Sequence, residues 1–257
     1  MIDSITIATP CFNEETVLST YFERIDFVRD QLKLEGCQVR LLLIDDGSSD
    51  RTLQIFGEYA QRNSNVTVIA HPQNLGYGAA VKTAMALART NWLIFVDSDT
   101  NYDQRLILEL IRTVETEPDL VNVSILAPQG QAGFAWYRRL LSSSASLLYR
   151  VLFPMLTRNV FTMTCGFRLY RTAILPDIFP MGDDFFATSE IMLRALRTGK
   201  RVTEFPAVNH RREQGVSKMK VFRNMMGHLR LALRTRFALL GDAGSLAEHL
   251  RRIGVYT

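Results

Sequence analysis

Short apolar runs alternate with amphipathic stretches through the first half of the chain, and this alternation constrains the fold more than any other feature. The runs predict strands at residues 5–9, 39–44, 66–69, 92–96 and 120–126. The positions of apolar residues predict helices at residues 17–32 and 103–115. Capping residues at 48–50 and the turn at 74–78 predict helices at residues 52–62 and 79–89. Such alternation is typical of an α/β protein with a mostly parallel central sheet flanked by helices.

Length and periodicity also predict the domain organisation. With 257 residues, 47% of them hydrophobic, the chain can bury one substantial core. We expect one domain over residues 1–217, made of a regular half (1–126) and a less regular half (127–217). Residues 218–257 form a basic amphipathic helical extension, which suits an anionic membrane, a membrane partner or packing against the core.

Charge and cysteine usage indicate the setting. The net charge of +4 suits an anionic partner such as a phosphate ester or a membrane surface. Three cysteines without a Cys-x-x-Cys pair indicate neither a disulfide framework nor a zinc site, and they favour the cytosol. No uncharged apolar run reaches the roughly 20 residues that span a bilayer, so we expect a soluble or peripheral protein.

Three of the expected strands end in polar, acidic sequences. These are Pro10-Cys11-Phe12-Asn13-Glu14, Asp45-Asp46-Gly47-Ser48 and Asp97-Ser98-Asp99-Thr100-Asn101. Ligands of open α/β sheets bind beyond the carboxyl ends of the strands. We therefore expect the three clusters to meet at one edge of the sheet.

The last cluster has the pattern of a cation site. Residues at i and i+2 of an extended segment point to the same side, so Asp97 and Asp99 can present two carboxylates together, and Asn101 can add a carbonyl oxygen. Such hard oxygen ligands suit Mg²⁺ or Mn²⁺, which neutralise charge on a diphosphate leaving group. The alternative is that the two aspartates only cap the next helix.

The other polar turns have two readings each. Asp45 and Asp46 can accept hydrogen bonds from a nucleobase or a ribose, or can belong to a turn that caps the helix at Thr52. The segment Gly76-Tyr77-Gly78 lacks the third glycine of a dinucleotide fingerprint, so it approaches another anion or only starts a helix. Lys82 either reaches a phosphate or covers the helix surface.

Taken together, the ordered motifs resemble glycosyltransferase family 2, and specifically its dolichol-phosphate mannose synthase branch. The resemblance covers roughly residues 5–220. Besides the three strand-end clusters it is carried by Asn74-Leu75-Gly76-Tyr77-Gly78-Ala79-Ala80, Cys165-Gly166-Phe167-Arg168-Leu169-Tyr170-Arg171, Glu190 and Gly215-Val216-Ser217-Lys218.

The resemblance implies a GT-A fold and a metal-dependent, inverting hexosyltransferase. The donor is a nucleotide sugar of the GDP-mannose or UDP-glucose type, and the acceptor is a polyprenyl or dolichyl phosphate at the cytosolic membrane face. No nucleic acid partner is implied. The family pattern places Pro10, Phe12, Glu14, Ile44 and Asp46 around the nucleoside, Asp97, Ser98, Asp99 and Asn101 at the metal and diphosphate, Arg168 in the substrate site, and Arg212 and Lys218 at phosphates.

Further residues are candidates for the acceptor side. Arg212 and Lys218 lie on a glycine-containing loop that can close over a polyanion. Arg138 or Arg139 heads an apolar helix over residues 138–156, and we choose Arg139 for the acceptor phosphate. An ionised phosphate acceptor attacks without a strong protein base.

Other functions stay open. The usual acceptor-contacting Arg is absent from residues 123–128, so a sugar hydroxyl of a glycan is the alternative acceptor. That acceptor requires a general base, for which Asp184 or its neighbour Asp183 is the candidate, although both also suit capping of the helix expected at 185–197. A nucleotidyltransferase and a non-catalytic nucleotide-sugar-binding subunit of a membrane complex are further alternatives.

Overall fold

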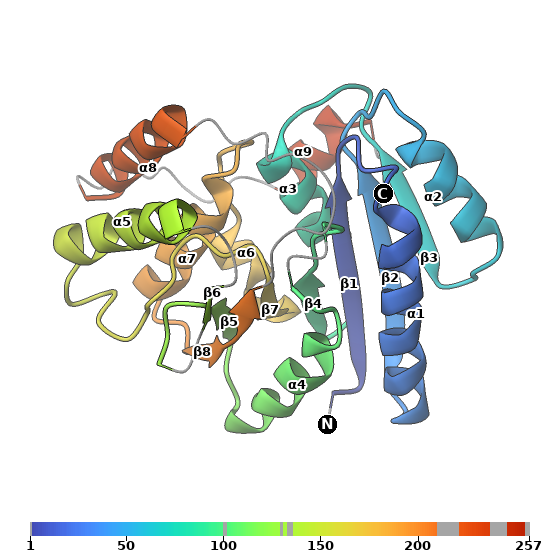
Figure 1. The fold of residues 1–257 in the computed structure, drawn as a ribbon, viewed down its shortest axis with the longest axis horizontal. Coiled ribbons are helices and arrows are strands. Elements are labelled where there is room, and N and C mark those ends of the chain that lie inside the picture. The colour runs from blue at the N-terminus through green and yellow to red at the C-terminus, as the bar shows by residue number, and fades with distance from the viewer. Residues whose placement is uncertain are drawn as a thin grey trace.

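A single seven-stranded sheet runs through the computed structural model, which describes residues 2–99, 102–128, 131–132, 136–209, 221–236 and 246–254 (Figure 1). The strand order is β3-β2-β1-β4-β7-β5-β8. The strands are β1 (Ser4–Cys11), β2 (Gln38–Asp45), β3 (Val66–Ala70), β4 (Trp92–Phe95), β5 (Leu120–Ser124), β7 (Arg168–Arg171) and β8 (Val202–Pro206). A separate two-stranded sheet pairs β6 (Gln131–Ala132) with β9 (Val208–Asn209).

The sheet is parallel except at β7, which runs antiparallel to both β4 and β5. The mostly parallel sheet expected from the sequence is therefore confirmed. The expected halves 1–126 and 127–217 share this one sheet, because β7 and β8 of the second half flank β5 of the first. The division at residue 217 stays a prediction.

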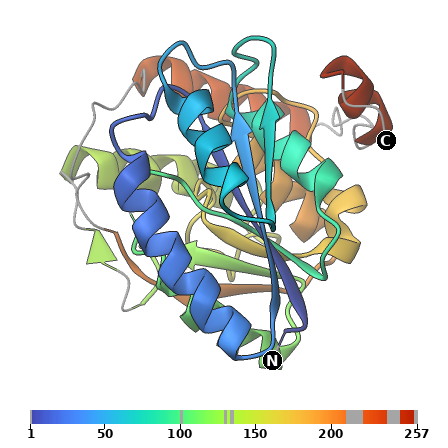
Figure 2. The ribbon, with the colours of Figure 1, turned by 90° about the vertical axis from the view of Figure 1, so that its right-hand side faces the viewer.

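Helices cover both faces of the sheet, as Figure 2 shows for the strands that pass between α1 and α3. The helices are α1 (Leu18–Leu34), α2 (Thr52–Gln61), α3 (Tyr77–Leu87), α4 (Leu106–Arg112), α5 (Trp136–Leu152), α6 (Leu175–Ile178), α7 (Ala187–Arg197), α8 (Val221–Arg236) and α9 (Leu246–Arg252). The helix expected over 103–115 is shorter, and a 3-10 turn at Thr113–Thr116 follows it.

Alternate residues of the strands feed two hydrophobic cores. In β2, Leu41 and Leu43 pack with α1, α2 and α4, whereas Leu42 and Ile44 pack with α3, α6 and α7. Side chains of a strand point alternately to opposite faces, so continuously apolar strands are required when both faces are covered. This explains why the strands read as uninterrupted apolar runs.

The two C-terminal helices pack against the domain at different places. The α8 helix lies against α5 and α7, where Nδ1 of His228 is 3.0 Å from the hydroxyl of Tyr149. The α9 helix lies against α3 (Figure 1). Within the part of the chain that the structure describes, no helix is both long and apolar enough to cross a bilayer.

Candidate active site

The three strand-end clusters meet around the end of β1. Both β2 and β4 pair directly with β1, in parallel register. The last residue of β1, Cys11, lies near all three clusters. Burial raises the pKa of its thiol, and the nearby charges of Glu14, Asp97 and Asp45 raise this pKa further. One carboxylate from each cluster therefore lies within electrostatic reach of the same buried thiol.

Hydrogen bonds join the loop after β1 to the loop after β2. Asn13 has a left-handed backbone conformation (φ 56°), and its side-chain oxygen accepts a hydrogen bond of 2.8 Å from the backbone N–H of Ser49. Its own N–H donates to Ser48 Oγ at 2.9 Å, and the N–H of Glu14 donates to Thr52 Oγ1 at 2.9 Å. The polar side chains of Asn13, Ser48 and Thr52 thus hold the two loops together at the sheet edge.

The residues predicted to surround the nucleoside lie in this region. Pro10 and Ile44 are buried register partners on β1 and β2. Phe12 and Glu14 are partly exposed in the loop that follows β1. The structure brings these four positions together, and contact with a nucleoside stays a prediction for each.

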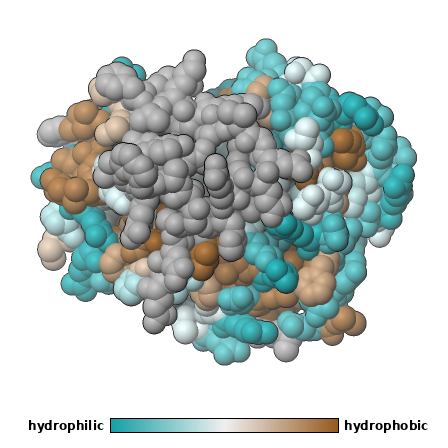
Figure 3. All heavy atoms as spheres, viewed as in Figure 1, coloured by the Kyte–Doolittle hydropathy of each residue, from teal (hydrophilic) through white to brown (hydrophobic). Residues whose placement is uncertain are grey.

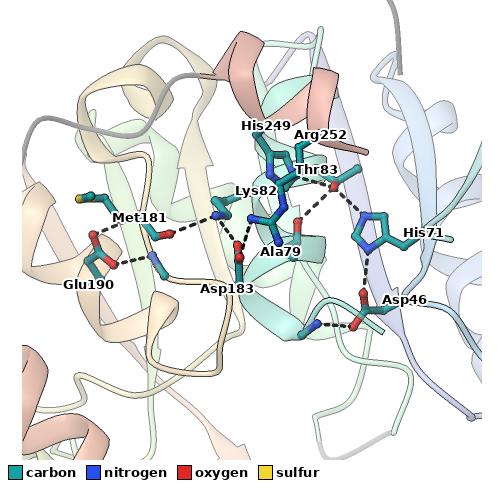
Figure 4. A network of polar contacts seen from close by, with 12 residues as sticks. Asp46, His71, Ala79, Lys82, Thr83, Met181, Asp183, Glu190, His249 and Arg252 are labelled. Carbon is teal, nitrogen blue, oxygen red and sulfur yellow. Dashed lines mark hydrogen bonds and ion pairs between the residues drawn. The ribbon is translucent and has the colours of Figure 1, made fainter. Parts of the chain in front are cut away.

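Asp45 and Asp46 have different environments although they are neighbours in sequence. Both carboxylate oxygens of Asp46 are used inside the protein: Oδ1 lies 2.7 Å from Nδ1 of His71 and accepts from the N–H of Leu75, and Oδ2 accepts from the N–H of Gly76 (Figure 4). Asp45 accepts from the N–H of Ser48 through Oδ2, and its buried Oδ1 has no hydrogen-bond partner. The unpartnered carboxylate oxygen of the two residues is therefore the buried Oδ1 of Asp45, whereas Asp46 organises the turn at residues 71–76.

Asp97, Ser98 and Asp99 follow β4 directly. Asp97 is partly exposed and the other two are buried. The hydroxyl of Tyr77 lies 3.4 Å from Oδ1 of Asp97, and burial together with the charge of Asp97 raises the pKa of this phenol. Tyr77 therefore stays protonated and can donate to the carboxylate.

These residues fit a hard cation as part of its ligand set. Carboxylate oxygens two residues apart at a sheet edge are the donors that Mg²⁺ and Mn²⁺ prefer. Among the described residues, no group of three or more His, Cys, Asp or Glu side chains could hold a metal alone. A cation bound here would need oxygen atoms from the substrate, which is usual for Mg²⁺ at phosphates. Asn101, the third predicted ligand, lies outside the described residues.

A loop over residues 181–186 closes against the start of α3. The N–H of Ala79 donates to the backbone oxygen of Asp183 at 3.2 Å. A Cβ atom on Gly78 would lie 2.5 Å from the backbone oxygen of Asp184, so only glycine permits this approach. Of the two readings of Gly76-Tyr77-Gly78, the structure supports the helix start, here shaped to receive the loop.

Asp184, the predicted general base, lies on this loop. It is exposed, and Oδ1 accepts a hydrogen bond of 3.0 Å from the N–H of Phe186 just before α7. Partial desolvation raises the pKa of Asp184, and the charges of Glu190 and Asp183 act in the same direction. The carboxyl thus holds the turn before α7, whose N-cap is Phe186, and is a stronger base than an ordinary aspartate.

Two basic residues have roles that the sequence did not predict. Lys82 is buried, forms an ion pair with Asp183 and donates to the backbone oxygen of Met181 at 3.1 Å, so the surface reading of this lysine is wrong. Arg168, predicted to bind substrate, is 0% exposed. Its guanidinium donates to Asn122 Oδ1 (2.6 Å) and to the backbone oxygens of Thr188 (2.5 Å) and Met163 (2.8 Å).

The contacts of Arg168 correct its expected role. All three nitrogens donate within the protein, and the side chain joins β7 to β5 and α7. A buried guanidinium needs such internal acceptors, and it is then not available to a ligand. Arg168 is a structural residue beneath the site.

The remaining predicted residues fall outside what the structure describes, wholly or for their side chains. Arg212 and Lys218 lie outside the described residues. Arg139 falls in the described backbone of α5, but its side chain does not belong to the described part.

A cavity of about 530 Å³ lined by Asp3, Trp92 and Arg171, among others, lies at the amino ends of β1 and β4, on the edge opposite to the carboxylates.

Comparison with known families gives one match over most of this region. The family described as "Glycosyl transferase family 2" matches residues 6–179.

Three curated relatives differ in how much of their length the chain covers. A dolichol-phosphate mannosyltransferase of Pyrococcus furiosus is 24% identical over 95% of this chain and 70% of its own length. A polyprenol monophosphomannose synthase of Mycolicibacterium smegmatis is 28% identical over 79% of each chain. An uncharacterized glycosyltransferase of Bacillus subtilis is 29% identical over 64% of this chain, which spans only about half (48%) of that relative.

Among solved structures, the fold is similar to glucosyl-3-phosphoglycerate synthase from Mycobacterium tuberculosis, which was crystallised with Mn²⁺, uridine diphosphate and phosphoglyceric acid. The TM-score is 0.65 at 18% identity, over 91% of this chain and 78% of the other. At this identity the likeness concerns the fold alone, and the expected GT-A fold is confirmed.

Proposed function

The chain belongs to glycosyltransferase family 2, and from this premise we propose that it transfers a hexose from a nucleotide sugar to a polyprenyl phosphate. The observation that carries the proposal is the convergence of Glu14, Asp45 and Asp97 at the carboxyl ends of three adjacent parallel strands. Such an edge is where α/β sheets bind nucleotides. The names of the Pyrococcus and Mycolicibacterium relatives support the acceptor class.

We place the donor's nucleoside beside the carboxyl ends of β1 and β2. The unpartnered Oδ1 of Asp45 can accept a hydrogen bond from a nucleobase N–H, which removes the cost of a buried acceptor left unsatisfied. Phe12 and Glu14 lie on the loop that borders this position. Asp45 therefore replaces Asp46 as our candidate for selecting the nucleobase.

The donor's diphosphate fits beside Asp97 and Asp99 with a divalent cation. When bound, Mg²⁺ or Mn²⁺ supplies positive charge that stabilises the departing diphosphate. The chain's own part is to orient the carboxylates, and the hydroxyl of Tyr77 at 3.4 Å from Asp97 Oδ1 serves this purpose. Asn101, Arg212 and Lys218 are proposed as further contacts to metal or phosphate.

Transfer to a phosphate requires positioning more than proton removal. An acceptor phosphate with a second pKa of about 6 is ionised at neutral pH, so one of its oxygens can attack the anomeric carbon directly. A bond forms from that oxygen to the carbon while the carbon–oxygen bond to the diphosphate breaks, which inverts the anomeric centre. Alignment of the two reactants then carries most of the rate enhancement.

The surface formed by α5 and α8 supports peripheral contact with a membrane, where a polyprenyl phosphate resides. Leu147 and Val151 of α5 and Met155 just after it are exposed, and α8 exposes Leu233 beside Arg230, Arg234 and Arg236. Figure 3 shows hydrophobic atoms gathered at the left edge, over α5 and α8. Apolar side chains mixed with arginines suit an anionic lipid surface, and the cytosolic face is the proposed location.

One observation favours a second acceptor class, a sugar hydroxyl. The raised pKa of Asp184 suits a general base that removes a hydroxyl proton. Such a base is needed for a glycan acceptor and not for an ionised phosphate.

A donor panel tests both proposals. Radiolabelled GDP-mannose, UDP-glucose and related donors are incubated with a polyprenyl phosphate in liposomes and with Mn²⁺ or Mg²⁺, followed by organic extraction. Label in the organic phase is expected with one donor, and about a hundredfold less with Asp99→Asn at an unchanged melting temperature. Label that passes only into a soluble glycan would reject the lipid acceptor, and loss of that label in Asp184→Asn would support the second class.

A further inference from the structure

The short helix α9, near the end of the chain, contacts both sides of the candidate site through two separate sets of polar contacts (Figure 4). It rests on α3 through Leu250 and Ile253, which pack with Ala86. In this position, His249 contacts Thr83 and Arg252 contacts Asp183, both more than sixty positions earlier in the chain. Neither residue belongs to the motifs that indicated the function.

The first set of contacts leads from His249 to the donor side. Nε2 of His249 lies 2.9 Å from Thr83 Oγ1, Thr83 Oγ1 lies 2.8 Å from Nε2 of His71, and Nδ1 of His71 lies 2.7 Å from Asp46 Oδ1. Asp46 in turn holds the N–H groups of Leu75 and Gly76. His71, Thr83 and His249 are all buried, so water does not replace a lost contact easily.

The partners assign the protons in this chain of contacts. A carboxylate only accepts hydrogen bonds, so Nδ1 of His71 carries the proton that faces Asp46. Burial lowers the pKa of His249 to about 4, so its ring is neutral at pH 7. Thr83 Oγ1 donates to the backbone oxygen of Ala79 at 3.0 Å, so it accepts from His249, whose single proton then lies on Nε2.

The second set of contacts leads from Arg252 to the acceptor side. Arg252 donates to Asp183 Oδ2 at 2.6 Å, and Lys82 pairs with the other oxygen of the same carboxylate. Burial alone would raise the pKa of Asp183, but hydrogen bonds from Lys82 and Arg252 lower it, which keeps the carboxylate charged. The pair therefore holds the loop that carries the candidate base Asp184.

Glu190 fixes this loop from its other side. Its two carboxylate oxygens accept the N–H groups of Met181 and Gly182 at 3.0 and 3.2 Å. The next residues of the loop bring Phe185 to the ring of Tyr77, with centroids 5.6 Å apart, and Tyr77 contacts Asp97. Displacement of the loop would therefore also shift Tyr77 and, through it, the carboxylate of Asp97 after β4.

We infer that α9 is a positioning element that braces the two halves of the active site separately, the nucleotide side through His249 and the acceptor side through Arg252. Both residues act through others, and neither is proposed to touch substrate. The inference rests on the proposed function for its kinetic consequences. The bracing itself is a property of the fold and can be measured without activity.

Single substitutions on α9 test the two sets of contacts separately. His249→Ala should weaken binding of the nucleoside diphosphate, measured by calorimetry with UDP or GDP and Mn²⁺, by about three- to tenfold. Arg252→Gln should leave that affinity within twofold of the wild type and lower kcat for transfer by about five- to twentyfold, because the loop at 181–186 is less well positioned. Arg252→Lys should restore part of the loss.

Arg251→Gln is the matched control, since Arg251 is exposed and adjacent on the same helix. Amide hydrogen exchange provides the readout that does not depend on activity. Exchange should rise over residues 71–79 in His249→Ala and over residues 181–187 in Arg252→Gln, and in neither segment for Arg251→Gln. A purely structural role would instead raise exchange in both segments and lower the melting temperature in both variants.

The outcomes separate this inference from the proposed function. If the wild type binds neither nucleotide, the proposed function fails and the exchange data still decide the role of α9. If the wild type binds and turns over while His249→Ala and Arg252→Gln both behave like Arg251→Gln, the inference is wrong.

Discussion

Replacing Arg168 by Met tests whether this residue supports the site from below or binds substrate. The guanidinium makes three hydrogen bonds within the protein, of 2.5 to 2.8 Å, and is 0% exposed. Hydrogen bonds from a charged group contribute about 1.5 kcal/mol or more each, so their sum is about 4 to 5 kcal/mol. Removing a buried charge offsets part of this sum, since burial of the charge was itself unfavourable.

We therefore expect Arg168→Met to lower the free energy of unfolding by about 2 to 4 kcal/mol. For a chain of this size each kcal/mol shifts the melting temperature by about 2 to 4 °C, so a fall of about 5 to 15 °C is expected by differential scanning fluorimetry. The KM for the donor should stay within twofold of the wild type at a temperature where the variant is folded.

Two further variants keep the result interpretable. Arg171→Met, on the same strand, removes a half-exposed arginine 4.0 Å from Asp119 and should cost at most about 1 kcal/mol. Asn122→Ala removes an acceptor of Arg168 and should destabilise in the same direction. A melting temperature within about 2 °C of the wild type, with a tenfold rise in donor KM, would refute the structural role of Arg168.

Three other predictions follow from single contacts. Asp45→Asn should weaken nucleotide binding about tenfold in calorimetry, because its Oδ1 is the unpartnered acceptor; an unchanged affinity would remove this residue from the nucleoside site. Gly78→Ala should reduce kcat and lower the free energy of unfolding by about 1 to 3 kcal/mol, because its Cβ would lie 2.5 Å from a backbone oxygen. Gly57→Ala is the control, since no atom lies within 4 Å of its added Cβ, and it should be neutral or stabilising. Equal effects of the two variants would exclude the steric reason. Stability should fall as the pH drops from 6.5 towards 4, because the buried rings of His228 and His249 have pKa values lowered from 6.5 to about 4 and stabilise the fold only while neutral. Each histidine contributes up to about 3 kcal/mol above pH 6.5, and replacement of both by Gln should flatten the pH dependence of the melting temperature.

Much of the fold was predictable because parallel, doubly covered strands must be apolar on both faces. The runs at residues 39–44 and 92–96 correspond to β2 and β4 within one residue at either end. The antiparallel β7 was not predicted, since Arg168–Arg171 is short and begins and ends with arginine. Its place depends on pairing with β4 and β5, which are distant in sequence.

The candidate site, like the fold, was predictable from the sequence only in part. The clusters after β1, β2 and β4 were predictable, because parallel strands deliver their carboxyl ends to one edge whatever the rest of the chain does. The choice between Asp45 and Asp46 was not, because neighbouring residues differ in which distant groups they meet. Only the turn at residues 71–76 determines that Asp46 is saturated and Asp45 is not.

Local periodicity and short motifs predicted five of the seven sheet strands, most of the covering helices, the convergence of acidic strand ends and the family. These depend on local periodicity and on short motifs, which act over a few residues. Tertiary structure alone decided that Lys82 and Arg168 are buried, and that α9 reaches the site. Lys82 meets Met181 across 99 positions and Thr83 meets His249 across 166, so no local pattern encodes those contacts. A polar side chain takes its role from the groups that desolvate it, and here those groups come from distant segments of the chain.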